Sequence, residues 1–185
     1  MRRVGTFLCA SLALLLRAQA PLTPSSGLLP DWDIRAILEE MSAHAKRLQP
    51  VLGEIDAKAW QSKGASESYV AQLQSSKDQA RAITDGAKAL AQNPEKLSAC
   101  LELYFRITTL EDMMASLGEG ARRYQEPALA QRLAALSAEN GANRNRFQAY
   151  IVNLATQREQ ECAVMDQEAQ RCRSVQATRP PAARK

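Results

Sequence analysis

Histidine is nearly absent from this sequence, since His44 is the one histidine in 185 residues. A di-iron bundle needs a Glu-x-x-His pair on each of two helices, and a cysteine nucleophile would have only this histidine as its base. The sequence also lacks Cys-x-x-Cys-His for covalent haem, Gly-x-Ser-x-Gly and a glycine-rich phosphate loop. These absences predict a protein that is not an enzyme and that carries no cofactor and no metal.

Large aromatic residues are also scarce, with three Phe and two Trp, and the apolar fraction of 45% depends heavily on alanine. No segment alternates apolar and polar residues over the length of a strand, so the sequence contains no strand signal. Alanine favours helices that pack closely. We therefore predict an all-α chain that forms one domain with a core large enough to be stable without disulfides.

The first twenty residues have the form of a secretory signal peptide. Arg2 and Arg3 precede an apolar run of thirteen residues, 4–16, and Ala18-Gln19-Ala20 follows with the small-x-small pattern of a cleavage site. The run is shorter than the roughly 20 residues that span a bilayer. We therefore expect an exported protein, periplasmic or extracellular, with no stable membrane anchor after cleavage. Pro21 is a poor residue after a cut at Ala20, so cleavage after Ala18 or after Ala20 remains open.

The net charge of +4 does not describe the folded part of the chain. Three of the 24 basic residues belong to the leader, which leaves 21 basic side chains against 20 acidic ones after cleavage. Several of the remaining basic residues gather at the C-terminus, in a segment without acidic residues. We expect 174–185 to be a disordered basic tail, and we expect no nucleic-acid binding.

After a Pro/Ser/Gly-rich linker at 21–30, apolar residues recur at helical spacing up to residue 173. Gly64 and Ser66 predict a first break, and Asn93 with Pro94 at the first helical position predicts a second. Pro127 predicts the start of a last helix, and Pro50 should kink the first. The apolar residues of the first predicted helix form a stripe along one face, which contains Ile34, Leu38, Met41, Ala45, Leu48, Leu52, Ile55 and Ala59.

These breaks predict an antiparallel four-helix bundle, residues 31–173, with an extended C-terminal fourth helix. The first three helices have about 27 to 31 residues each, whereas the fourth would have about 47 if it runs unbroken from Pro127. Its turns beyond about Ala155 should then overhang the bundle at the end where the first helix begins. Leu28 and Leu29 of the linker are candidates to pack there, and Gly141 offers a place where the helix bends instead.

Two asparagines, Asn140 and Asn143, occupy core positions of the fourth apolar stripe. One interpretation is a hydrogen-bonded core polar layer that fixes the register of the helices, with Ser76 and Thr108 as partners. The alternative is a pocket for a small apolar ligand or a metal. Haem held by His44 and a methionine such as Met113 or Met114 is a further form of that alternative.

Three cysteines remain after the leader is removed. Cys100 should be a small buried residue near Tyr150, because Cys162 lies roughly 20 Å away along the bundle. Cys162 and Cys172 share one helical face with Met165. Three interpretations stay open: an intrachain disulfide if the helix turns back after Met165, an interface with another chain, or a site for a soft metal.

The function that these features favour is a binding or structural role of an exported helical bundle. The partner is either a second copy of the chain, giving a homo-oligomer, or another protein of the cell envelope, and it would cover the late face of the fourth helix. A bundle that binds an apolar ligand, haem or metal in its core is the first alternative. An enzyme with an unrecognised site is the second.

Overall fold

The computed structural model describes residues 31–177, which contain six helices and no strand. The prediction of an all-α chain is therefore confirmed for this part of the chain. The predicted signal peptide, the linker with Leu28 and Leu29, and residues 178–185 of the predicted tail lie outside the described residues. The helices are α1 (Asp31–Gly53), α2 (Ala57–Gln61), α3 (Ser68–Gln92), α4 (Leu97–Tyr124), α5 (Pro127–Glu139) and α6 (Gly141–Ala177).

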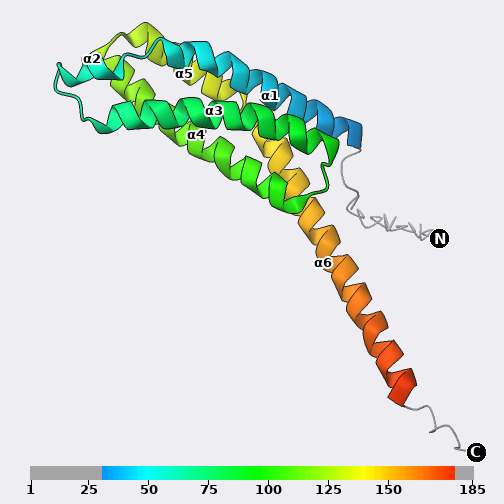
Figure 1. Cartoon of the computed structure of the whole chain (residues 1–185). Helices are drawn as coiled ribbons and strands as arrows, with labels where there is room; N and C mark the ends of the chain where they lie inside the picture. Colours follow the sequence, from blue (N-terminus) through cyan, green and yellow to red (C-terminus); the bar gives the residue numbers. More distant parts are fainter. Residues whose placement is uncertain (1–30, 178–185) are drawn as a thin grey trace, which may run out of the picture.

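The long helices lie side by side around one core (Figure 1). Helix α1 contacts α3, α3 contacts α4, and α4 contacts α5 and α6. Because α1 also contacts α5 and α6, the helices form a closed ring around the core. Residues 31–155, which hold this core, are called the body below. None of the helices within residues 31–177 has the length and apolar character needed to cross a membrane.

The core follows the predicted apolar stripes closely. Its largest fully buried side chains include Trp60, Phe147 and Tyr150, and alanines such as Ala80 and Ala87 are completely buried between helices. Small side chains at these positions let neighbouring helices approach closely, as the alanine-rich composition indicates. Ala59 departs from the pattern, because it belongs to the first predicted stripe but is exposed.

Ala59 is exposed because the first predicted helix is two helices in the structure. Pro50 lies inside α1, which ends three residues later at Gly53, and residues 54–56 lead into the five-residue helix α2. The Asp56 carboxylate accepts a hydrogen bond of 3.0 Å from the Ala59 amide and so caps α2. Gly64 then adopts the left-handed φ of 88° that its predicted role as a helix end requires.

The start predicted for the third helix, which corresponds to α4, is wrong. Asn93 and Pro94 were expected to begin it, but α4 starts at Leu97. The reason lies in the Pro94 carbonyl, which accepts hydrogen bonds from the Cys100 thiol at 3.2 Å and from the Tyr150 hydroxyl at 3.1 Å. These buried contacts hold Pro94 in a turn before the helix.

The last predicted helix is interrupted once, at Asn140, next to the glycine where a bend was considered. Asn140 has φ −78° and ψ −13°, which is close to helical geometry, and its carbonyl accepts a 2.9 Å hydrogen bond from the Arg144 amide. The chain therefore continues in helical form from α5 into α6. Helix α6 reaches Ala177, four residues beyond the end predicted at residue 173.

Candidate functional site

The last part of α6 extends away from the body as a single helix (Figure 1). From Thr156 to Gln176 every side chain is exposed apart from Glu161, which is half-buried. Residues 156–177 are called the projecting helix below. At 1.5 Å per residue the projecting helix is about 33 Å long. The overhang beyond Ala155 therefore lies where the sequence places it.

One face of the projecting helix holds both predicted interface cysteines. Cys162 and Cys172 are exposed and free, and Met165 between them is 70% exposed. Ten residues of straight helix separate the two cysteines by about 15 Å, which is more than twice the span of a disulfide. Because α6 continues without a turn after Met165, this geometry does not join the two cysteines within one chain. The same separation prevents them from sharing one metal ion.

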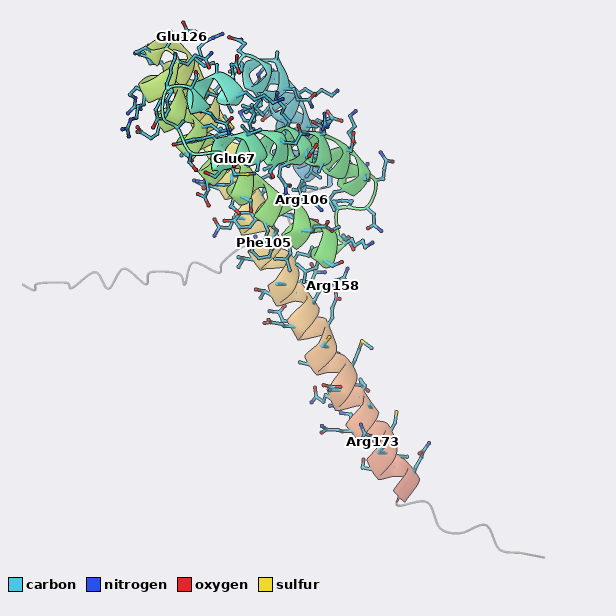
Figure 2. The ribbon with its side chains drawn as sticks, turned by 60° about the vertical axis from the view of Figure 1, so that its left-hand side comes forward. Glu67, Phe105, Arg106, Glu126, Arg158 and Arg173 are labelled. Carbon is cyan, nitrogen blue, oxygen red and sulfur yellow. The ribbon has the colours of Figure 1, made fainter. Side chains whose placement is uncertain are left out.

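An ion-pair cluster lies at the base of the projecting helix. Arg158 donates hydrogen bonds to Glu95 in the α3–α4 turn at 3.2 Å and to Glu161 one turn further along α6 at 2.8 Å. The hydrogen bond from Arg158, together with one from Gln157, lowers the pKa of Glu161. Figure 2 shows Arg158 near the point where α6 leaves the body and Arg173 near the far end. Arg158 thus links the base of the projecting helix to the α3–α4 turn.

The two asparagines of the predicted polar layer have different surroundings. Asn140 is buried, with 6% of its surface exposed, and its Oδ1 atom has no hydrogen-bond partner among the described residues. Asn143 is half-buried and donates a 2.7 Å hydrogen bond to Glu40. The expected partners, Ser76 and Thr108, bond instead to carbonyls of their own helices. The structure therefore places Asn140 in the core and Asn143 at its rim.

His44 and Asn140 line an interior cavity of about 20 Å³. The His44 Nε2–H group donates a 2.7 Å hydrogen bond to the Leu136 carbonyl, and burial lowers the pKa of His44 below its ordinary 6.5. Glu111 lines the same cavity, and its Oε1 atom is buried without a partner among the described residues while its other oxygen pairs with Arg144. The cavity presents hydrogen-bond acceptors and has the volume of about one water molecule.

Cys100 and Tyr150 meet at a shared acceptor, as their predicted proximity requires. Both are buried, and both donate to the Pro94 carbonyl. Burial raises the pKa of the Cys100 thiol to about 11. A thiol that stays protonated at neutral pH is a poor nucleophile, so Cys100 is a packing residue here.

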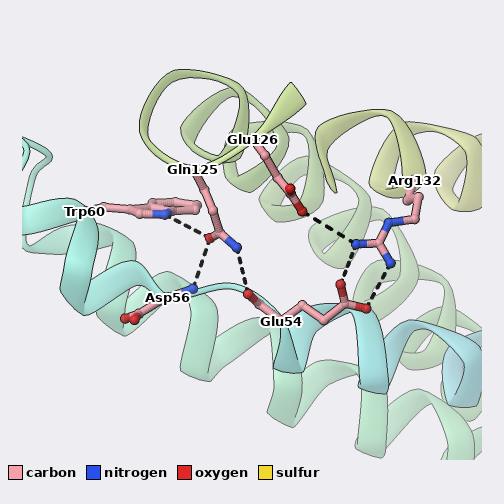
Figure 3. A network of polar contacts seen from close by, with 6 residues as sticks. All are labelled: Glu54, Asp56, Trp60, Gln125, Glu126 and Arg132. Carbon is pink, nitrogen blue, oxygen red and sulfur yellow. Dashed lines mark hydrogen bonds and ion pairs between the residues drawn. The ribbon is translucent and has the colours of Figure 1, made fainter. Parts of the chain in front are cut away.

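Sequence reasoning missed the polar junction at the other end of the body (Figure 3). The Gln125 side-chain oxygen accepts hydrogen bonds from the Trp60 indole at 3.1 Å and the Asp56 amide at 3.2 Å, and its amide group donates to the Glu54 carbonyl at 2.9 Å. Arg132 pairs with Glu54 beside it. The sequence signals nearest to this junction are the kink predicted at Pro50 and the helix start predicted at Pro127.

The described residues show no group of three or more His, Cys, Asp or Glu side chains arranged to hold a metal ion. On the body, Phe105 is the most exposed large apolar residue at 62%, with Leu101 one turn before it at 37%. The chain matches no family model, no curated protein and no solved structure. The arrangement of the side chains is therefore the basis for the functional proposal.

Proposed function

We propose that this chain is an exported, non-catalytic binding or structural protein that associates with another helix through its projecting helix. In this proposal the body is an antiparallel four-helix bundle whose fourth member is α5 continued by the first turns of α6. The alternating directions of α1, α3, α4 and α5 in Figure 1 and the ring of contacts among them support that arrangement. The bundle is the support, and the projecting helix is the association surface.

The observation that carries the proposal is a long helix that the body does not cover. An isolated helix is only marginally stable in water, because helix formation is cooperative and its nucleus is costly. The ion pairs along the projecting helix, such as Arg171 with Glu168 at 3.2 Å, lie between exposed side chains, and such pairs contribute at most about 0.5 kcal/mol each. A partner that packs along the helix would supply the missing stabilisation.

The composition of one face suits a helical partner. Cys162, Met165, Ala169 and Cys172 follow steps of three and four residues, which is the spacing of a coiled-coil seam. Three of these four side chains are small, so a second helix can approach closely. Two exposed cysteines also suit an oxidising compartment outside the cytoplasm, in agreement with the signal peptide that the sequence predicts.

The core-ligand alternative receives less support. Pockets for small molecules have volumes of about 300 to 1,000 Å³, whereas the cavity beside His44 and Asn140 has about 20 Å³. Met114 lines this cavity, but haem would need the surrounding helices to separate. An acceptor-lined cavity of this size suits a single water molecule better than an apolar ligand.

The molar mass of the protein in solution tests the proposal. The chain from residue 21 onward, measured by light scattering under reducing conditions, should have twice the mass of one chain or more. Deletion of residues 156–185 should give a folded monomer, because the bundle core lies before residue 156. Deletion of residues 178–185 alone is the matched control, and it should leave the association intact. A monomer with and without residues 156–185 would contradict self-association and would leave the envelope-protein partner.

A further inference from the structure

We propose that the partner of the projecting helix is a second copy of this chain, bound antiparallel, with Cys162 of each copy joined to Cys172 of the other by a disulfide. This inference rests on the proposed function and adds the identity of the partner, the register and the redox chemistry. The observations behind it are the positions of four side chains, the charge of Arg158 and the place where the body ends.

The apolar face is symmetric about residue 167. Cys162 and Cys172 lie five residues before and after Gln167, and Met165 and Ala169 lie two before and after it. A twofold axis at Gln167 therefore places Cys162 opposite Cys172 of the second copy and Met165 opposite its Ala169. The axis also falls at the middle of the projecting helix, so the two helices overlap along their whole exposed length.

The charge of Arg158 favours the antiparallel register over a parallel one. The antiparallel axis brings Glu159 beside Arg173 of the second copy, and symmetry gives this attraction twice. The same axis brings Asp166 beside Asp166 of the second copy and Glu168 beside its Glu168. These are two repulsions, each of which occurs once in the dimer. A parallel pair has two Glu161–Asp166 repulsions and two Glu168–Arg173 attractions, so the charges that flank the face balance equally in both orientations. The parallel pair, however, sets Arg158 against Arg158 on the contact face itself. Arg158 instead faces Gln176 in the antiparallel pair.

The body permits an antiparallel partner and obstructs a parallel one. Ile151 and Leu154 of α6 are buried against the body, and the cysteine face follows them along the same side of the helix. A parallel partner on that side would continue into the body. In an antiparallel partner Ala177, the last described residue, lies level with Gln157, and the partner's own body lies at the opposite end of the paired helices.

The separation of two closely packed helices suits a disulfide. Helix axes packed 8–10 Å apart, each with Cα atoms about 2.3 Å from its axis, leave facing Cα atoms roughly 3.4 to 5.4 Å apart. This range overlaps the 4.4–6.8 Å that disulfides adopt. Axes about 9 to 10 Å apart give Cα separations of roughly 4.4 to 5.4 Å, which lie within the disulfide range. Met165 opposite Ala169, a long side chain against a short one, suits this spacing.

The oxidant for this bond is a small-molecule disulfide such as oxidised glutathione. The Cys162 thiolate attacks one sulfur of the oxidant, forms a mixed disulfide and releases one thiolate. The Cys172 thiolate of the second copy then attacks the Cys162 sulfur, and the second thiolate leaves. For each bond two protein thiols lose two protons and two electrons, and one molecule of oxidant becomes two thiols.

Single-cysteine pairs test the register. Cys162→Ser and Cys172→Ser chains, each starting at residue 21, are incubated with oxidised glutathione separately and as an equal mixture. Free thiols are then alkylated, and the products are separated on a denaturing gel without reductant. We expect a cross-linked dimer from the mixture, at least tenfold more than from either variant alone. The double variant Cys162→Ser/Cys172→Ser is the control for any contribution from Cys100.

The outcomes separate this inference from the proposed function. Equal cross-linking of each variant alone would overturn the antiparallel register in favour of a parallel one. A mixture that forms no cross-link, from chains that light scattering shows to be dimers, would overturn the inference and leave the proposed function standing. Chains that are monomers by light scattering would overturn the inference and the self-association form of the proposed function, and would leave the envelope-protein partner.

Discussion

At the scale of single residues, His44 gives the body a specific response to pH. Burial lowers its pKa from 6.5, with a smaller opposing effect of its hydrogen bond to Leu136 and of the nearby carboxylates of Glu139 and Glu111. The unfolded chain therefore takes up a proton at a higher pH than the folded chain does. The stability that neutral His44 provides above pH 6.5 is lost as the pH falls from there through the lowered pKa.

We expect the free energy of unfolding, measured by urea denaturation, to fall between pH 7 and pH 5 in the parent chain. His44→Gln should remove the part of this slope that lies above pH 5, because glutamine can donate to the Leu136 carbonyl but does not titrate. An unchanged slope in the variant would show that other groups cause the pH dependence.

The three cysteines of residues 31–177 should differ sharply in reactivity. Cys100 is buried with a pKa of about 11, whereas Cys162 and Cys172 are exposed. In the reduced chain from residue 21 onward, an aromatic disulfide reagent at pH 8 should modify two thiols rapidly. The third thiol should react at least a hundredfold more slowly until denaturant is added. Three similar rates would contradict the buried position of Cys100.

At the scale of elements, the close packing of α2 against α4 depends on Gly120. A Cβ atom at this position would overlap the Trp60 ring and would lie 3.0 Å from the Tyr69 ring. Gly120→Ala should therefore lower the free energy of unfolding by about 1–3 kcal/mol, as overpacking does. Gly118 lies in the same helix with nothing within 4 Å of its added Cβ, so Gly118→Ala should be neutral or stabilising by up to about 1 kcal/mol. Equal thermal shifts for both variants would contradict this packing.

The junction between the α1–α2 and α4–α5 turns depends on Gln125. Gln125→Ala removes three hydrogen bonds, including the one to the buried Trp60 indole. We expect a loss of about 1–2 kcal/mol in chemical denaturation, because water reaches part of this exposed site and replaces some of the bonds. Gln131→Ala, at an exposed position of α5, is the control and should change stability by less than about 0.5 kcal/mol. A loss no larger than that of the control would show that the junction is not structural.

Periodicity predicted most elements correctly because core positions in a helix repeat every three to four residues. It failed where tertiary contacts decide the local structure. The turn that holds Pro94 depends on Tyr150, 56 residues away, and the exposure of Ala59 depends on how the chain turns after Pro50. The burial of Asn140 could be predicted from periodicity. The hydrogen bond of Asn143 to Glu40 could not, because it depends on how α1 and α6 pack.

At the scale of the whole molecule, the overhang was predictable from helix lengths alone. Three helices of similar length cannot cover a fourth chain segment that is about 20 residues longer. The identity of the partner was not predictable in this way, because a helix face with small apolar residues accepts many helices. The proposal that the partner is a second copy of the chain rests on the symmetry of the cysteine face.

Backbone hydrogen exchange of residues 156–177, measured by mass spectrometry across a range of protein concentrations, tests the central claim most directly. A helix that is stabilised by a second chain exchanges slowly only when that chain is bound. We predict that protection of this segment rises at least tenfold with concentration, in parallel with the molar mass, while protection of the body stays constant. Rapid exchange of residues 156–177 at every concentration at which the chain is measured would contradict the claim that the projecting helix is an association surface between copies.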